Sequence, residues 1–386
     1  MIFSKKKPAL SHVLHQALDL TLDESSRLSA AESLIDTPLE QLLPALLELS
    51  PSELDGVLQT WLDLQGCLRF LISLREGALA DTRFAAIAKA LGALLRIAFS
   101  GSFLNVQQID WRSPALLLER VMQEEQVHQF AGWLDMKNRL DQDRRLFVLT
   151  HVAEPLEPLA FLEVALTREL ADSVQAILAI ESTVLPTEKA KCAIFYSINS
   201  VHAGLRGISF GERLIHEAVD ILRQELPQLK TFSTLSPVPS LRKWLTTLQP
   251  HELAKYAGRP SGRHPVSREE WATQVKQALS QPEVPEALKD LLLKAAADYL
   301  TGNGDAKKIK DPVAKFHLGN GARLERINWA ADTSPNGVRQ SFGLMVNYLY
   351  DLASLSKNKA AFRVKHNSNY SRAVHRLVPR VRTGDD

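Results

Sequence analysis

The stretch from Cys192 to Leu248 limits the possible folds of this chain most strongly. It begins with an apolar run rich in β-formers, Cys192 to Asn199, which predicts a buried strand. A turn with several glycines follows from Gly204 to Gly211. Apolar residues then recur at the spacing of one helix face, at Leu214, Ile215, Ala218, Val219 and Leu222. A second strand is expected at Lys230–Ser236, before a helix at Leu241–Leu248. This order predicts an α/β unit built around a glycine turn.

A helix that starts after a glycine turn can hold a phosphate group. Its first N–H groups are unpaired and lie at the positive end of the helix dipole. Arg206 and Ser209 in this turn add a guanidinium that can pair with phosphate and a hydroxyl that can donate to it. Glycine is also common in tight strand-to-helix connections, and Arg206 alone is compatible with a surface ion pair. Spacing alone leaves both interpretations open.

The segment from Leu10 to about Gln142 has a helical pattern almost throughout. Thr37-Pro-Leu-Glu40 and Ser50-Pro-Ser-Glu53 are predicted capping boxes with proline at the first helical position. Further helices are expected at Arg83–Ile97 and Pro114–Met122. The helices carry leucine stripes but are short and capped, which favours a helical bundle over a coiled coil.

The pattern changes near Asp141–Arg145, where strands are expected at Leu146–Leu149 and Leu159–Leu166. Gln249–Ser267 is rich in proline, glycine and basic residues, which predicts an exposed loop, and the helical pattern returns at Glu269–Leu300. The fold class that follows is α+β. We expect an N-terminal all-helical bundle domain over residues 1–143. A mixed α/β domain should occupy residues 144–386, with a helical insertion around 249–312.

Composition narrows the class of protein without selecting a function. With 386 residues, 45% of them apolar and 23% charged, the chain is long enough for two globular domains. Cys67 and Cys192 lie in apolar runs, and the sequence has neither a disulfide framework nor the ligand spacing of a metal site. No apolar run is long enough to cross a membrane, and the N-terminus has no secretory pattern, so the cytoplasm is the expected location.

The net charge of +2 does not demand a nucleic-acid partner. Eight Lys or Arg residues follow Ser356 with no acidic residue before Asp385, but this tail matches no nucleic-acid-binding module. A solvated or inter-subunit role is favoured for it.

Several strings in the second half of the chain occur in a family-specific order. They are Phe195-Tyr-Ser-Ile-Asn-Ser200, Gly204-Leu-Arg-Gly-Ile-Ser-Phe-Gly211, Leu235-Ser-Pro-Val-Pro239 with Trp244, and Phe316-His-Leu-Gly-Asn-Gly-Ala322 with Arg326-Ile-Asn-Trp329. Over roughly Leu146 to Leu352 the chain resembles the malonyl-CoA decarboxylases. The resemblance implies a catalytic domain like that of the GNAT acyltransferases. It also implies conversion of malonyl-CoA to acetyl-CoA and carbon dioxide through an enolate.

The resemblance also gives the glycine turn a role. In GNAT-like proteins a loop of the form Arg/Gln-x-x-Gly-x-Gly/Ala holds the pyrophosphate of coenzyme A. Here serine stands where the first glycine of that frame is expected. The implied coenzyme A-binding residues are Arg206, Gly207, Ile208, Ser209, Phe210, Gly211 and Glu212.

Ser236 is the first candidate for chemistry. Pro237 should keep it extended at the carboxyl end of its strand, where ligands bind in open α/β sheets. A serine before proline is also an ordinary turn former, and no Gly-x-Ser-x-Gly elbow surrounds Ser236. By resemblance it is the catalytic serine.

His317 is the second candidate. A lone histidine among apolar neighbours is more often structural, but by resemblance His317 is the catalytic histidine, and a near-neutral pKa would suit proton delivery. The family implies a base-like serine and a proton-donating histidine. It also implies that Asn347 and Tyr350 support the active site. Both residues are equally compatible with a purely structural role.

The resemblance implies a homotetramer assembled through the helical domain, with no metal and no cofactor beyond the coenzyme A of the substrate. Two other functions remain open. A GNAT-class acyltransferase would pass the acyl group to an amine. A catalytically inactive helical scaffold would only sense coenzyme A.

Overall fold

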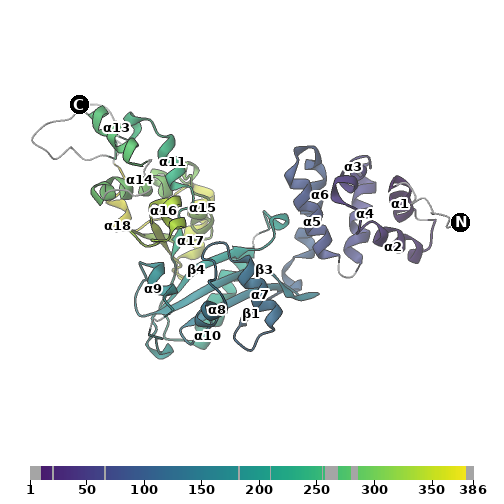
Figure 1. Cartoon of the computed structure of the whole chain (residues 1–386), viewed down its shortest axis with the longest axis horizontal. Helices are drawn as coiled ribbons and strands as arrows, with labels where there is room; N and C mark the ends of the chain where they lie inside the picture. The colour runs from purple at the N-terminus through teal and green to yellow at the C-terminus, as the bar shows by residue number, and fades with distance from the viewer. Residues whose placement is uncertain are drawn as a thin grey trace, which may run out of the picture.

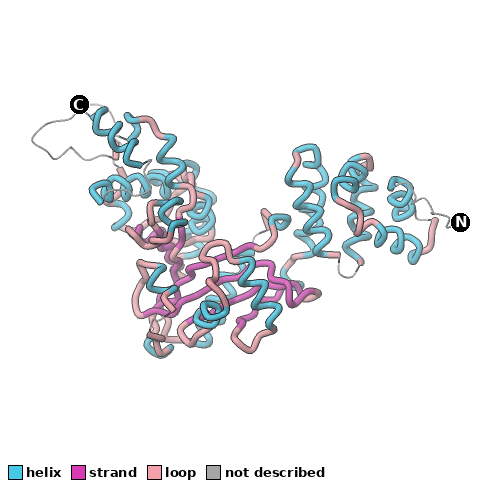
Figure 2. Tube along the Cα trace, in the orientation of Figure 1, coloured by secondary structure: helices cyan, strands magenta, loops and turns pink. Residues whose placement is uncertain are grey.

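The computed structural model describes residues 10–19, 21–64, 67–180, 183–208, 210–253, 255–256, 268–279 and 286–379. A group of helices forms the N-terminal part, a mixed sheet lies beside it, and a second group of helices lies beyond the sheet (Figure 1). In Figure 2 the strands, in magenta, lie between the two helical groups. The predicted α+β fold class is confirmed.

Six helices form the N-terminal group around a leucine-rich core. They are α1 (Leu10–Leu18), α2 (Glu24–Ser33), α3 (Leu39–Leu47), α4 (Pro51–Asp63), α5 (Leu68–Ala80) and α6 (Ala85–Ala98). The capping box predicted at Ser50 is confirmed, since Ser50 and Glu53 bond reciprocally at the start of α4. The one predicted at Thr37 is wrong, because α3 begins at Leu39 and its cap residue, Pro38, makes no side-chain bond.

The expectation of helix up to about Gln142 is wrong at Leu104–Ile109. These residues form β1, which pairs antiparallel with β2 (Arg144–His151). The segment is only six residues long and Val106 and Ile109 are β-branched, so pairing at the edge of the sheet outweighs the helical pattern around it. The sheet therefore takes its first strand from the segment that the sequence assigns to the helical domain. The helix expected at Pro114–Met122 is confirmed as α7 (Ala115–Glu124).

The sheet has eight strands in the order β1-β2-β3-β4-β5-β8-β6, and β7 pairs with β8. Besides β1 and β2 they are β3 (Glu154–Thr167), β4 (Cys192–Ser200), β5 (Thr231–Thr234), β6 (Ser236–Pro237), β7 (Arg323–Asn328) and β8 (Met345–Leu349). Among the described strands, β4 and β5 form the single parallel pair, and they are paired only from Cys192 to Phe195 on β4. The rest of β4 runs on past the end of β5.

Helices cover both faces of the central strands. Phe147 and Leu149 of β2 belong to the apolar cluster of α10 (Phe210–Glu225), whereas Leu146 and Val148 belong to the cluster of α7 and α8 (Trp133–Asn138). This alternation explains why every residue of β2 is buried.

Further helices follow β3 or surround the second half of the sheet. They are α9 (Val174–Leu178), α11 (Leu241–Thr247), α12 (Pro250–Leu253), α13 (Arg268–Leu279), α14 (Lys289–Thr301), α15 (Pro312–Gly319), α16 (Pro335–Ser341), α17 (Leu355–Lys365) and α18 (Arg372–His375). The exposed loop expected at Gln249–Ser267 contains α12, and its residues 257–267 lie outside the described part of the chain. Within the described residues, no helix has the length and apolar character to cross a membrane.

The N-terminal helices contact the sheet region through a short turn after β4. This turn, η4 (Ala203–Leu205), packs on α5. A Cβ atom on Gly204 would lie 2.1 Å from the backbone carbonyl oxygen of Ile72. Glycine is therefore required at this position for steric reasons.

We expect Gly204→Ala to lower the free energy of unfolding by about 1–3 kcal/mol, because the backbone of α5 cannot move aside for the added methyl group. Gly101→Ala is the control, since its Cβ would meet Arg213 at an ordinary 3.6 Å, and its effect should stay within about 0.5 kcal/mol. Differential scanning calorimetry measures both variants. Equal effects would contradict the close packing at Gly204.

Candidate active site

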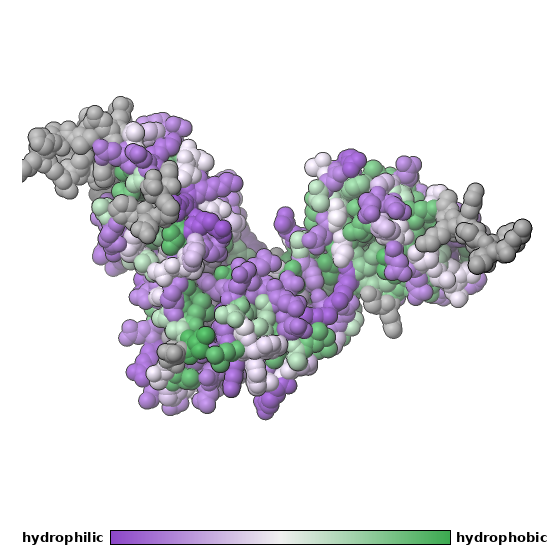
Figure 3. Space-filling model, viewed as in Figure 1, coloured by the Kyte–Doolittle hydropathy of each residue, from purple (hydrophilic) through white to green (hydrophobic). Residues whose placement is uncertain are grey.

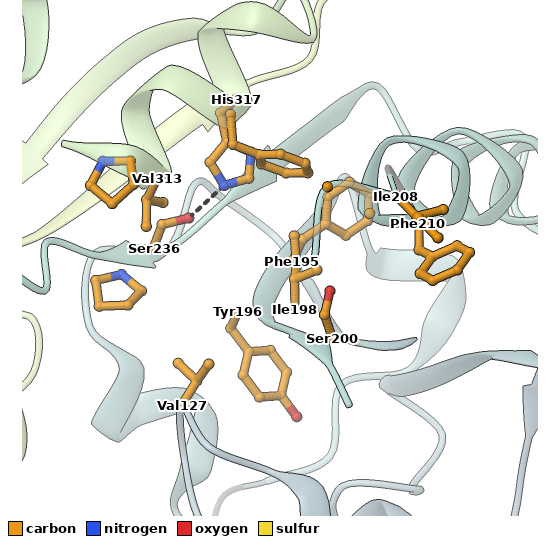
Figure 4. A pocket seen from close by; sticks show the side chains of 15 residues that line it. Val127, Phe195, Tyr196, Ile198, Ser200, Ile208, Phe210, Ser236, Val313 and His317 are labelled. Carbon is orange, nitrogen blue, oxygen red and sulfur yellow. Dashed lines mark hydrogen bonds between the residues drawn. The ribbon is translucent and has the colours of Figure 1, made fainter. Parts of the chain in front are cut away.

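A pocket of about 450 Å³ lies beside the second half of β4, between the glycine loop, β6 and α15 (Figure 4). Most of its lining is apolar. The lining residues are Val127, Phe195, Tyr196, Ile198, Ser200, Gly207, Ile208, Phe210, Gly211, Ser236, Pro237, Pro312, Val313, Phe316 and His317. The pocket therefore joins the glycine loop to the serine and the histidine that the sequence singles out.

Ser236 is held in place by the sheet. It lies on β6, opposite Val346 of β8, and is 6% exposed. Pro237 follows it on the strand and lines the same pocket. The hydroxyl Oγ lies 3.3 Å from Nε2 of His317. The structure thus brings together two side chains that are 81 residues apart in the sequence.

Helix α15 positions His317. The helix begins with Pro312, and the side chain of Asp311 caps it by accepting a 2.8 Å bond from the N–H of Ala314. The imidazole stacks on the ring of Tyr348 at a centroid distance of 4.6 Å. Its Nδ1 lies 2.8 Å from the hydroxyl of Tyr350. Two hydrogen-bonding contacts and a stacked ring fix the orientation of the imidazole.

His317 is 2% exposed, and burial lowers the pKa of its imidazole to about 3. The near-neutral pKa expected from the sequence is therefore wrong, and the ring is uncharged at physiological pH. Burial also raises the pKa of the Tyr350 phenol, so the phenol keeps its proton. The imidazole of His317 and the phenol of Tyr350, which meet at Nδ1, are therefore both neutral.

The surroundings of the two hydroxyl groups favour one tautomer of His317. Among the described residues, the Tyr350 hydroxyl has no other hydrogen-bond partner than Nδ1 and does not line the pocket, whereas Ser236 lines the pocket and can donate its proton there, which favours donation from the phenol to Nδ1. The imidazole proton then sits on Nε2 and is donated to Ser236 Oγ. The hydroxyl proton of Ser236 remains available to a ligand in the pocket. The three side chains form a chain of donors directed into the pocket.

The second supporting residue, Asn347, lies outside this chain of donors. Its side-chain oxygen accepts bonds from Arg326 and Asn328, and its amide donates to the carbonyl groups of Ala171 and Thr234. All its polar atoms are used within this network, and it does not line the pocket. Tyr350 reaches His317, whereas Asn347 supports the sheet.

The glycine loop meets the pocket with part of its predicted residues. Gly207, Ile208, Phe210 and Gly211 line it, and Gly207 has a φ of +86°, a conformation that favours glycine. Arg206 is exposed and does not line the pocket. Ser209 lies outside the described residues.

Glu212, which the resemblance implies as a coenzyme A-binding residue, does not line the pocket. It forms ion pairs with Lys359 and, at 3.6 Å, with Arg363, both on α17. The carboxylate thus fastens α17 to the start of α10. Within the described residues, no group of three or more His, Cys, Asp or Glu side chains is placed to hold a metal ion.

Sequence reasoning misses the apolar walls of the pocket. Val127 comes from the segment assigned to the helical domain, and Pro312 and Val313 precede the histidine on α15. The only available signal for the last two is their position one helical turn before His317. Nothing in the local sequence connects Val127 with β4.

The fold and the pocket define a class of α+β proteins in which a glycine loop and a buried serine–histidine pair share one cavity. A family model described as the malonyl-CoA decarboxylase C-terminal domain matches residues 102–385. The chain belongs to the malonyl-CoA decarboxylase family. The match begins just before β1, in agreement with the strand that the sequence pattern misses.

Relatives and solved structures agree with this membership. The mitochondrial malonyl-CoA decarboxylase of goose (Anser anser anser) is 38% identical over 323 residues, which cover 78% of this chain and 64% of the goose protein. That of mouse (Mus musculus) is 33% identical over 344 residues, which cover 82% of this chain and 69% of the mouse protein. The chain thus spans a little under two thirds of the goose protein.

The malonyl-CoA decarboxylase structure from Agrobacterium vitis aligns with a TM-score of 0.82 at 32% identity and covers 95% of this chain and 99% of its own. The structure from Cupriavidus metallidurans aligns with a TM-score of 0.79 at 33% identity, and the alignment covers 96% of this chain and 98% of the Cupriavidus chain. The similarity therefore extends over the N-terminal helices as well as the sheet.

We expect the His317 imidazole to stay neutral, with the proton on Nε2, at every pH above about 5. A folded-state pKa of about 3 is below the ordinary value of 6.5. The stability contributed by the neutral ring is therefore present above pH 6.5 and is lost as the pH falls toward 3. Histidine-selective ¹⁵N NMR measures both the tautomer and the titration, and loss of the signal in His317→Gln assigns it. A midpoint near 6.5, or a proton on Nδ1, would contradict this assignment.

Proposed function

We propose that this chain converts malonyl-CoA to acetyl-CoA and carbon dioxide. The observation that carries the proposal is the chain of neutral donors, Tyr350 to His317 to Ser236, which ends in an apolar pocket shared with the glycine loop. Decarboxylation of a malonyl thioester needs a site that destabilises a carboxylate, stabilises an enolate and returns one proton. Each requirement corresponds to a feature of this pocket.

The glycine loop is the proposed binding site of coenzyme A. Gly207 and the start of α10 lie at one end of the pocket, and the start of a helix is suited to a phosphate group. The Ser236–His317 pair lies in the same pocket beside β6 and α15. A thioester bound with its phosphates against the loop would place its acyl group toward this pair.

The surroundings of the acyl group favour loss of carbon dioxide. None of the fifteen residues that line the pocket is a lysine or an arginine, and the imidazole of His317 is neutral. A carboxylate in such a site loses its hydration and gains no cationic partner, and this desolvation costs free energy. Because carbon dioxide is uncharged, its release removes this cost.

The donor chain then supplies the proton. When the carbon–carbon bond breaks, its electron pair remains on the acyl group as an enolate, and the Ser236 hydroxyl is placed to donate to it. Ser236 gives its proton to the α-carbon and takes the proton of His317 Nε2, while Nδ1 takes the phenolic proton of Tyr350. The negative charge passes from a strongly basic enolate to a phenolate. A proton from solvent then enters through the pocket at Nε2 while Nδ1 returns its proton to the phenolate, which restores the starting tautomer.

We expect Ser236→Ala and His317→Gln to lower turnover of malonyl-CoA by about 10²–10⁴-fold, because each breaks the proton path. Tyr350→Phe should lower turnover as well, because it removes the phenol that keeps the imidazole proton on Nε2 and that supplies a proton to Nδ1. Ser33→Ala, on the exposed side of α2, is the control that should keep full turnover. Release of acetyl-CoA without any acceptor is measured by chromatography, and the affinity for coenzyme A by calorimetry.

Wild-type protein that releases acetyl-CoA only when an amine is supplied would favour the acyltransferase instead. That reaction is less well suited to the site, because a proton on Nε2 prevents the imidazole from acting as a base toward an amine. Binding of coenzyme A without any turnover would favour the scaffold. Either result would contradict the proposed decarboxylation.

Assembly as a homotetramer through the N-terminal helices is a further part of the proposal, taken from the family resemblance. Large apolar side chains are exposed on these helices at Leu47, Leu79 and Ile97, and Figure 3 shows hydrophobic residues, in green, on this part of the surface. Residence in the cytoplasm is proposed from the sequence alone, whereas the goose and mouse relatives are named as mitochondrial proteins.

A further inference from the structure

A buried arginine of the N-terminal helices holds the glycine loop from behind. Arg75 lies on α5 and is 7% exposed. Its Nη1 donates to the carbonyl oxygen of Gly204 at 2.6 Å, and its Nη2 donates to that of Arg206 at 3.0 Å. Its Nε donates to Ala88 on α6 at 3.2 Å. One guanidinium thus joins two helices to the loop that precedes α10.

The surroundings of Arg75 are unusual for a buried cation. Among the described residues, no carboxylate lies within ion-pair distance of its guanidinium, and only backbone carbonyl groups satisfy it. A buried charge without a counter-ion is costly. Gly92 of α6 leaves the room that the guanidinium occupies, because a Cβ at that position would lie 2.9 Å from Nη2. Both helices are therefore shaped to present this cation to the loop.

The bond to Arg206 sets the direction of the next N–H group. In a trans peptide the carbonyl and the following N–H point in opposite directions. Since the Arg206 carbonyl points toward α5, the Gly207 N–H points away from it. Gly207 lines the pocket, and among the described residues its N–H has no hydrogen-bond acceptor. This unpaired donor is available to a ligand in the pocket.

We propose that Arg75 is a positioning residue for coenzyme A: it fixes the peptide between Arg206 and Gly207 so that the Gly207 N–H can donate to the diphosphate of the thioester. This inference rests on the proposed function of the site. It gives the N-terminal helices a part in substrate binding in addition to any part in assembly. The acyl group, whose proposed place is at the Ser236 end of the pocket, should not depend on Arg75.

Arg69 provides a matched control on the same helix. It pairs with Glu154, at 3.2 Å, and with Glu157, both on β3, so it also connects α5 to the sheet region. Among the described residues, neither of these ion pairs involves the glycine loop. Arg69→Met should therefore weaken the same interface without changing the direction of the Gly207 N–H.

The experiment compares Arg75→Met, Gly92→Ala and Arg69→Met with the wild-type chain. Gly92→Ala keeps Arg75 but displaces its guanidinium, and alanine is favourable within a helix, so this variant moves the cation without removing it. Steady-state kinetics are measured with malonyl-CoA and with malonyl-pantetheine, which lacks the diphosphate. Calorimetry gives the Kd of coenzyme A itself.

For Arg75→Met and Gly92→Ala we expect the KM for malonyl-CoA and the Kd for coenzyme A to rise by about tenfold. The kcat should stay within about threefold, and kcat/KM for malonyl-pantetheine should be unchanged within about twofold. Arg69→Met should bind coenzyme A like the wild type. A purely structural role of Arg75 would instead lower activity equally on both substrates.

Three results would overturn the inference. They are an unchanged Kd for coenzyme A in Gly92→Ala and Arg75→Met, an equal loss with malonyl-pantetheine, or an equal rise of the Kd in Arg69→Met. If Arg75→Met does not fold, the Kd of Gly92→Ala for coenzyme A alone tests the role of Arg75. Wild-type protein that binds coenzyme A but releases no acetyl-CoA would refute the proposed function, while the Kd values would still test the role of Arg75.

Discussion

The contact between α10 and α15 is the constraint on which the site depends. A Cβ on Gly211, in the first turn of α10, would lie 2.8 Å from Cζ of Phe316. The glycine therefore lets the helix after the loop start directly against the helix that carries His317. Because both helices meet at this point, the loop and the Ser236–His317 pair open into one pocket. A side chain at residue 211 would require the ring of Phe316, which also lines the pocket, to shift.

Burial determines the chemistry available to the pair. A histidine in water is a pH-sensitive base, but the enclosed ring of His317 is neutral and is held by Tyr350 on one side and Ser236 on the other. A charged imidazolium would stabilise the substrate carboxylate and oppose its loss. A neutral donor leaves the carboxylate unsupported and can still return a proton. The same apolar walls therefore serve both steps of the proposed reaction.

Local patterns predict the parts of the molecule that depend on neighbouring residues. The strand, glycine turn and helix from Cys192 to Glu225 follow from apolar spacing, and Pro237 predicts the extended position of Ser236. The six-residue strand β1 is missed, because its pairing partner lies some forty residues further on. Short edge strands gain most of their stability from such pairing and little from local preference.

The properties of individual site residues are harder to predict, since they come from tertiary contacts. Asn347 and Tyr350 are close in sequence and are equal candidates there, yet the first faces Arg326 and Asn328 while the second reaches His317. The lowered pKa of His317 comes from burial by several elements. Arg75 precedes the glycine loop by more than a hundred residues, and no motif marks it. Only the fold brings these groups together.

The most direct test of this account is a crystal structure with an unreactive malonyl-CoA analogue. We expect the malonyl carboxylate and α-carbon within the apolar walls beside Ser236 Oγ and His317 Nε2, with the diphosphate at the N–H groups of the loop that ends at Gly211. An analogue with its acyl group outside this pocket, or with a lysine or arginine paired to its carboxylate, would contradict it.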